Sequence, residues 1–137
     1  MIMREMTVDA TVENIPAVTD FVNRKLEELQ CPPKSQMQID IAIDELFGNI
    51  SNYAYKPDIG PATVRVEVET HPVAVTITFI DGGRQFDPLS TDEPDVTLPA
   101  SERRIGGLGL YLVRKTMDEI TYEYRNGKNI LKIRKNI

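Results

Sequence analysis

The stretch from Pro33 to Tyr55 constrains the fold of this chain more than any other, because its apolar residues recur at helical spacing. They fall at i, i+4, i+7, i+8, i+11 and i+15, namely at Ile39, Ile43, Leu46, Phe47, Ile50 and Ala54. This pattern predicts an amphipathic helix, which advances about 100° per residue and presents one apolar face. An apolar helix face needs a second layer to cover it, so the rest of the chain must supply that layer.

The opposite face of this predicted helix carries polar groups that allow two interpretations. Glu45, Asn49 and Asn52 project within about 60° of one another, and Gly48 lies beside them. Glycine costs a helix about 1 kcal/mol relative to alanine. One interpretation is a solvated polar face with an incidental glycine. The other is a ligand site in which Glu45 acts as a base, Asn49 binds a hard cation and Gly48 lets a ligand approach the backbone.

Composition narrows the class of protein. The chain has 137 residues, of which 41% are hydrophobic and 27% charged, as expected for a single globular domain spanning residues 1–137. Its net charge of −5 argues against direct nucleic-acid binding. No apolar run approaches the ~18 residues of a membrane span and the polar start gives no secretory signal, so we expect a cytoplasmic protein. With one cysteine and one histidine, any metal would be bound mainly by oxygen, which favours Mg²⁺.

Residues outside the long helix form patterns that predict strands and further helices. Residues 6–10 alternate as a strand, and residues 18–29 have a helical face that Asn14 could cap. Residues 64–68 and 75–79 alternate around Thr70-His71-Pro72, and residues 120–124 and 131–133 alternate around Asn126-Gly127, so two hairpins are expected. Together with a later helix, these elements predict an α+β fold: a two-layer α/β sandwich whose mixed, largely antiparallel sheet is covered on one face by helices.

Two glycine-containing segments are further candidate ligand sites. Asp81-Gly82-Gly83 follows a strand, where paired glycines mark either a tight turn or the close approach of a ligand. Gly106-Gly107-Leu108-Gly109 opens an apolar segment, and a helix start of this kind either binds an anion or packs closely against a neighbour. Residues 87–102 contain five acidic and no basic residues, whereas residues 103–137 contain nine basic and three acidic ones. The acidic segment lacks periodicity, and we expect it to be a lid that becomes ordered when a ligand binds.

These three segments, in this order, resemble the boxes of the GHKL or Bergerat ATP-binding fold, which histidine kinases, DNA gyrase, heat-shock protein 90 and mismatch-repair ATPases share. The boxes correspond to Glu45 to Asn49, Asp81 to Gly83, and Gly106 to Gly109. The chain is most similar to the bacterial anti-sigma factor serine/threonine kinases. That resemblance rests on residues 44–49 (DELFGN), 86–89 (FDPL) and 106–113 (GGLGLYLV) and covers essentially the whole chain.

The resemblance implies a role for each matched residue. Glu45 would be the general base, Asn49 the Mg²⁺ ligand and Asp81 the acceptor for the adenine amino group, while Gly83 would let the base approach. The glycines at the later helix start would bind phosphates, and the charge and position of Arg103 and Arg104 suggest that either could reach the γ-phosphate. The complete predicted set of nucleotide-binding residues is Asn49, Asn52, Asp81, Gly83, Arg104, Gly106, Gly107, Leu108 and Gly109.

The resemblance also implies a function. A protein of this family uses ATP and Mg²⁺ to phosphorylate a serine or threonine of a small STAS-domain antagonist protein, and it sequesters a sigma factor when the antagonist is absent. The alternative is an ATP-binding regulatory module that transfers no phosphate. Tyr53 departs from the histidine of many relatives, and Gln85 replaces the second glycine of the fuller Asp-x-Gly-x-Gly box. The sequence leaves open the partners' identities, the process controlled and the oligomeric state, a homodimer included.

Overall fold

The computed structural model describes residues 2–90 and 107–137, which form a five-stranded sheet and the helices that cover it. The strands are β1 (Ile2–Asp9), β2 (Pro61–Thr70), β3 (Val73–Asp81), β4 (Glu119–Arg125) and β5 (Lys128–Asn136), in the spatial order β1-β2-β3-β5-β4. Each neighbouring pair is antiparallel. The predicted α+β two-layer sandwich is therefore confirmed, and the described strands include no parallel pair.

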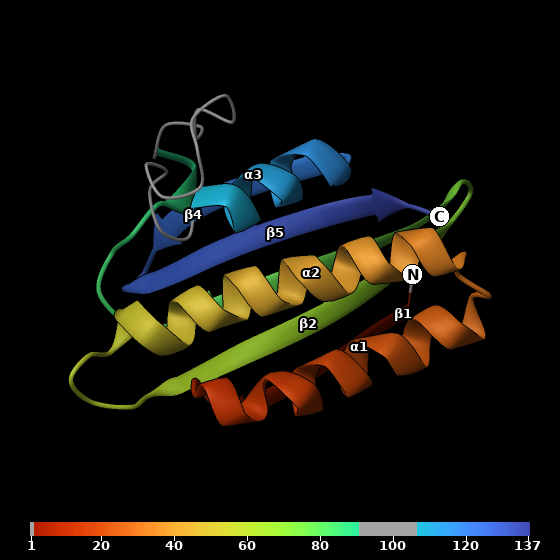
Figure 1. The fold of residues 1–137 in the computed structure, drawn as a ribbon. Coiled ribbons are helices and arrows are strands. Elements are labelled where there is room, and N and C mark those ends of the chain that lie inside the picture. Colours follow the sequence, from red (N-terminus) through yellow and green to blue (C-terminus); the bar gives the residue numbers. More distant parts are fainter. Residues whose placement is uncertain (1, 91–106) are drawn as a thin grey trace.

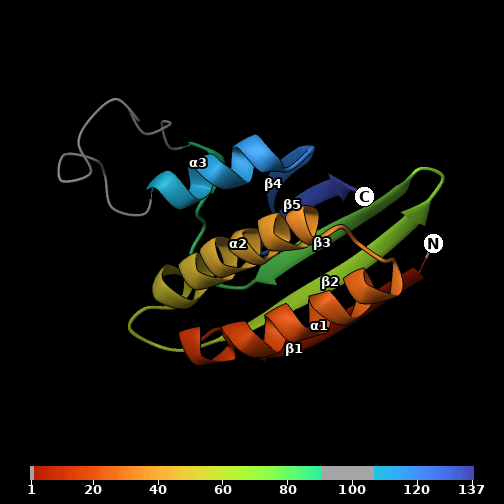
Figure 2. The same cartoon turned by 45° about the vertical axis from the view of Figure 1, so that its right-hand side comes forward.

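The helices α1 (Ile15–Glu28), α2 (Pro33–Asn49) and α3 (Gly107–Thr116) lie across one face of the sheet, with α2 between the other two (Figures 1 and 2). Short 3₁₀ turns occupy Val12–Asn14 (η1) and Pro88–Ser90 (η3). Among the described residues, no helix is long and apolar enough to cross a membrane.

The core lies between the helix layer and the sheet. Alternate residues of β2 and β3 point toward the helices, and the apolar face of α2 covers them. The side chains that are almost completely buried there include Ile39, Ile43, Leu46, Phe47, Val64, Val66, Ile77 and Phe79. The helical and strand periodicities read from the sequence thus meet in one apolar layer, as the two-layer prediction requires.

Local details differ from the predictions at three places. The first strand covers Ile2–Asp9 and is longer than residues 6–10. Asn14 stands at the predicted N-cap position of α1, but its side chain makes no cap bond, because its Nδ2 donates to the backbone oxygen of Asp9 at 2.8 Å. The helix predicted to reach Tyr55 is α-helical to Asn49 and continues as a π-helical turn, η2 (Ile50–Ala54).

Four chain segments with polar or glycine residues meet at one end of the molecule. The C-termini of α2 and β3 and the N-termini of α3 and β5 all lie at the left-hand end of the ribbon in Figure 1. The antiparallel pairing of β3 with β5 places Asp81 directly opposite Asn129 at this end. The fold therefore brings together the residues on which the sequence motifs depend.

Candidate functional site

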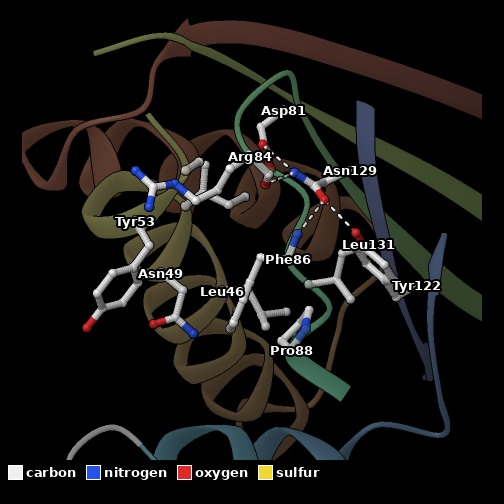
Figure 3. Close-up of a pocket in the computed structure, with 12 residues that line it drawn as sticks. Leu46, Asn49, Tyr53, Asp81, Arg84, Phe86, Pro88, Tyr122, Asn129 and Leu131 are labelled. Carbon is white, nitrogen blue, oxygen red and sulfur yellow. Dashed lines mark hydrogen bonds between the residues drawn. The ribbon is translucent and has the colours of Figure 1, made fainter. Parts of the chain in front are cut away.

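A pocket opens at this end of the sheet, beneath the last turns of α2 and η2. It encloses about 440 Å³ of space, open solvent at its mouth included. Figure 3 shows Asn49 and Tyr53 on one side of the pocket and Asn129 with Tyr122 on the other. The residues that line it are Leu46, Asn49, Ile50, Tyr53, Ala54, Asp81, Arg84, Phe86, Pro88, Tyr122, Asn129 and Leu131. Most of this lining is apolar, so the few polar groups decide what the pocket can bind.

Asp81 is an acidic residue that lines this pocket, and only 5% of its surface is exposed. Its Oδ1 atom accepts hydrogen bonds from the Gly83 backbone N–H at 2.9 Å and from Asn129 Nδ2 at 2.9 Å. Among the described residues, none donates to the other carboxylate oxygen, Oδ2. The site therefore presents a fixed hydrogen-bond acceptor inside an apolar pocket.

The turn after Asp81 is pressed against the end of η2. A Cβ atom on Gly83 would lie 2.3 Å from the backbone oxygen of Ala54, so only glycine fits there. Arg84 N–H donates to the same oxygen at 2.9 Å. Tyr55 completes the contact, because its hydroxyl donates to Pro61 O at 2.6 Å and accepts from the Gly82 N–H at 2.7 Å. The close approach at Gly83 is thus made by the chain itself.

Glu45 and Asn49 lie one turn apart at the end of α2, as the helical spacing predicts. Asn49 Nδ2 donates to Glu45 Oε1 across a long contact of 3.4 Å, and Asn49 also lines the pocket. Burial raises the pKa of the half-buried Glu45 carboxyl above its ordinary value, and the bond from Asn49 opposes this shift. A carboxylate with a raised pKa beside a pocket is suited to accept a proton.

The N-terminus of α3 lies against the same carboxylate. Gly107, Leu108 and Gly109 form its first turn, whose N–H groups have no acceptor within the helix. A Cβ atom on Gly109 would come 2.2 Å from Glu45 Oε2, so Gly109 lets α3 approach this carboxylate closely. Contacts therefore run without a break from the pocket through Asn49 and Glu45 to the start of α3.

Several predicted residues do not join this arrangement. Asn52 is exposed on η2 and does not line the pocket, because the wider π turn no longer advances by the ~100° per residue that the prediction assumed. Gly48 faces Ile15 of α1, whose Cδ1 would be 3.9 Å from an added Cβ. Arg103, Arg104, Gly106 and the larger part of the predicted lid, residues 91–102, lie outside the described residues.

The amide oxygen of Asn49 suits a magnesium ion whose other ligands are phosphate oxygens and water. Because the Asn49 amide nitrogen donates to Glu45, its Oδ1 is the atom left for a cation. Among the residues that the structure describes, no group of three or more histidine, cysteine, aspartate or glutamate side chains could hold a metal. Mg²⁺ commonly binds to one or two protein groups together with substrate phosphates and water.

Sequence reasoning missed Asn129 and Tyr122. Asn129 is buried with 6% of its surface exposed, and it connects Asp81 to the loop after it and to Tyr122. The usable signal was the alternation of β5, because position 129 shares the inward face with Leu131 and Ile133. A polar side chain on that face needs partners, but the sequence did not show which strand would supply them.

Comparisons with known proteins find a matching family model and several relatives. A family model described as the histidine kinase-like ATPase domain matches residues 8–135. The serine-protein kinase RsbW of Bacillus cereus is 33% identical over 98 residues, covering 66% of this chain and 58% of the relative. The serine/threonine-protein kinase BtrW of Bordetella bronchiseptica is 28% identical over 93 residues, covering 68% of this chain and 65% of the relative. The chain thus spans about three-fifths of the length of these relatives.

Two solved structures resemble the fold. The structure of the RsbU and RsbW domains of Rv1364c from Mycobacterium tuberculosis superposes on 99% of this chain and 32% of its own, with a TM-score of 0.69 and 16% identity. The SiaB–SiaC complex from Pseudomonas aeruginosa covers 96% of this chain and 89% of its own, with a TM-score of 0.58 and 19% identity. At these identities the likeness concerns the fold.

Proposed function

Because the chain belongs to the histidine kinase-like ATPase domain family, we propose that it is an ATP-dependent serine/threonine protein kinase of the anti-sigma type. Its acceptor would be a small STAS-domain antagonist protein, and its second partner a sigma factor that it holds when the antagonist is absent. The names of the relatives RsbW and BtrW as serine and serine/threonine kinases support this proposal. We place the protein in the cytoplasm, where such partners act.

One observation carries the proposal: the path of contacts from Asp81 and the pocket through Asn49 and Glu45 to Gly109. Asn49 lines the pocket and donates to Glu45, and Glu45 lies against Gly109. An adenine base in the pocket would meet the acceptor of Asp81, while the phosphates would reach the N–H groups of the α3 start. The carboxylate is then near the end of the nucleotide at which phosphate transfer takes place.

The chemistry assigned to Glu45 is that of a general base. Glu45 takes the proton of a serine or threonine hydroxyl as the hydroxyl oxygen bonds to the γ-phosphorus of ATP. The bond between that phosphorus and the bridging oxygen breaks, and ADP leaves. Mg²⁺, bound through Asn49 Oδ1 and phosphate oxygens, would neutralise charge on the phosphates. Burial raises the pKa of the Glu45 carboxyl, which makes it a better proton acceptor than an exposed glutamate.

Other residues of the pocket fit a nucleotide base. The rings of Tyr53 and Phe86 line the pocket and are 55% and 46% exposed, so both offer apolar surface at its mouth. Tyr53, the departure from the family pattern, thus lies where a base would enter. We leave Asn52 out of the proposed site, and we keep Arg104 and Gly106 as predicted phosphate ligands outside the described residues.

The test combines partner capture with phosphate transfer. Proteins captured by the tagged chain with and without ATP are identified by mass spectrometry, and each is incubated with the chain and γ-labelled ATP. We expect label on one captured protein, and we expect Glu45→Gln to reduce its transfer rate by about 10²–10⁴-fold while ATP still binds. Glu27→Gln is the matched control, because it makes the same substitution at an exposed glutamate of α1 that does not line the pocket.

The outcomes separate the two functions considered. Labelling of a partner by the wild type, lost in Glu45→Gln and kept in Glu27→Gln, supports the kinase. Partner binding that depends on ATP without any labelling favours the regulatory module. A wild-type chain that does not bind ATP would contradict both.

A further inference from the structure

Asn129 is the most completely bonded side chain at the pocket. Its Nδ2 donates to Asp81 Oδ1 at 2.9 Å and to the backbone oxygen of Arg84 at 2.8 Å. Its Oδ1 accepts from the Phe86 N–H at 3.1 Å and from the Tyr122 hydroxyl at 2.5 Å. Both amide protons and two acceptor positions are therefore in use, which ties β3, β4, β5 and the loop after β3 together at one point (Figure 3).

The backbone partners decide which way the Asn129 amide points. Arg84 O can only accept, and Phe86 N–H can only donate, so the amide nitrogen must face Arg84 and the amide oxygen must face Phe86. Nδ2 then also faces Asp81, and it holds Oδ1 of that carboxylate as an acceptor. Two donors, the Gly83 N–H and Asn129 Nδ2, hold Oδ1 of Asp81, so the carboxylate cannot rotate about its Cβ–Cγ bond. Its Oδ2 therefore stays available to a ligand.

We propose that Asn129 is a positioning residue that sets the preference of this site for a 6-aminopurine over a 6-oxopurine nucleotide. This inference rests on the proposed binding of ATP. A fixed acceptor pairs with the amino group of adenine, whereas it would meet the carbonyl oxygen of hypoxanthine as a second acceptor. Sites built to bond one polar group reject a base that lacks it more strongly than an apolar pocket does.

The first experiment compares ATP with inosine triphosphate, in the presence of Mg²⁺, by calorimetry. We expect the wild type to prefer ATP and Asn129→Leu to lose roughly 10- to 100-fold of that preference, with little change in inosine triphosphate binding. Thr78→Val is the matched control, because Thr78 is fully buried on β3 and its hydroxyl has no partner among the described residues. A folded Asn129→Leu protein with the wild-type preference would overturn the inference.

A second variant covers the case in which Asn129→Leu does not fold. Asn129→Asp keeps the size and the acceptor toward Phe86 and Tyr122, but it places two carboxyl groups in contact. A proton shared between them restores a donor toward Asp81, and their mutual repulsion raises the pKa of the pair. The ATP affinity of Asn129→Asp relative to wild type should therefore recover as the pH falls. Ionisation of the triphosphate is common to both proteins and cancels in this ratio.

Other ionisable groups near the pair are the same in both proteins. They are Tyr122 and Asp87 beyond Asn129, Tyr55 and Lys128 beside the turn at Gly82, and Arg84 in the loop. A ratio that stays constant with pH would overturn the positioning role, since a purely structural defect does not depend on a shared proton. Wild-type protein that binds both nucleotides equally would also overturn it. Wild-type protein that binds neither would instead contradict the proposed function.

Discussion

Gly109→Ala separates the proposed role of Glu45 in catalysis from the stability of the fold. The added Cβ would lie 2.2 Å from Glu45 Oε2 and 2.6 Å from Cδ, whereas ordinary van der Waals contacts begin at 3.4 Å. The atoms in the way belong to the end of a flexible side chain. The carboxylate can therefore retreat, by roughly 1 Å, while the backbone of α2 and α3 stays in place.

The expected magnitudes follow from that displacement. A shift of roughly 1 Å at a reacting group costs about 10²-fold in rate, so phosphate transfer should fall by about that factor. Alanine stabilises a helix by about 0.5–1 kcal/mol over glycine, and an off-rotamer glutamate costs about 0.5–1.5 kcal/mol, so the stability should hardly change. ATP binding should also persist, because the N–H groups of α3 are retained.

Three assays check this prediction: urea unfolding, an ATP titration, and labelled phosphate transfer to the captured acceptor protein. Gly48→Ala is the matched control, since its Cβ would meet only Ile15 Cδ1, at 3.9 Å. That variant should gain about 0.5–1 kcal/mol of stability and keep its transfer rate. A Gly109→Ala protein that transfers phosphate as fast as the wild type would refute the idea that the position of Glu45 controls the reaction.

Three further predictions concern the pocket and its charge. Asp81→Asn should weaken ATP binding by about 1.5–3 kcal/mol through loss of a charge-assisted hydrogen bond, and unchanged calorimetry would remove Asp81 from the site. Gly83→Ala should destabilise the fold by about 1–3 kcal/mol in urea, because its Cβ would meet the Ala54 backbone at 2.3 Å; an equally stable variant would show that η2 can move. Because the folded-state pKa of Glu45 is raised above 4.5, the wild type loses stability as pH rises from the ordinary value to the raised one. Glu45→Gln has no carboxyl to titrate, so its free energy of unfolding relative to wild type should grow across that pH interval and then stay constant. A difference in the free energy of unfolding, measured in urea, that does not change with pH would contradict the burial of Glu45.

The parts of the fold that could be predicted are those set by local periodicity. The apolar spacing of α2 and the valine alternation of β2 and β3 reflect which face of each element is buried in the core. Both patterns predicted the type of element correctly. The sequence Asn126-Gly127 also predicted its turn correctly. Both residues adopt the positive φ values that such a turn requires, 55° and 76°. The positions of Glu45, Asn49 and Asp81 at one end of the fold then followed from the family resemblance.

The parts that could not be predicted depend on contacts between distant residues. Asn129 bonds to Asp81 across 48 positions, and this contact exists only because β5 pairs with β3 in one register. The sequence of β3 or of β5 alone does not determine that register. The position of Asn52 was missed for a local reason, because the change from an α-helix to a π turn after Asn49 has no clear sequence signal.

The unfavourable features of this chain gather at its proposed site, which is itself an argument for function. The valine strands and the apolar face of α2 obey the rules of their secondary structure. The site end instead combines a π turn and a half-buried carboxyl with two glycines, Gly83 and Gly109, at which a Cβ atom would collide with a neighbouring group. Each of these costs stability or restricts the sequence, and no packing need explains why Glu45 should lie against Gly109. Proteins tolerate such local conflicts where function requires them. A scaffold selected for stability alone would place an uncharged side chain at position 45, whereas the proposed proton transfer needs a carboxylate there.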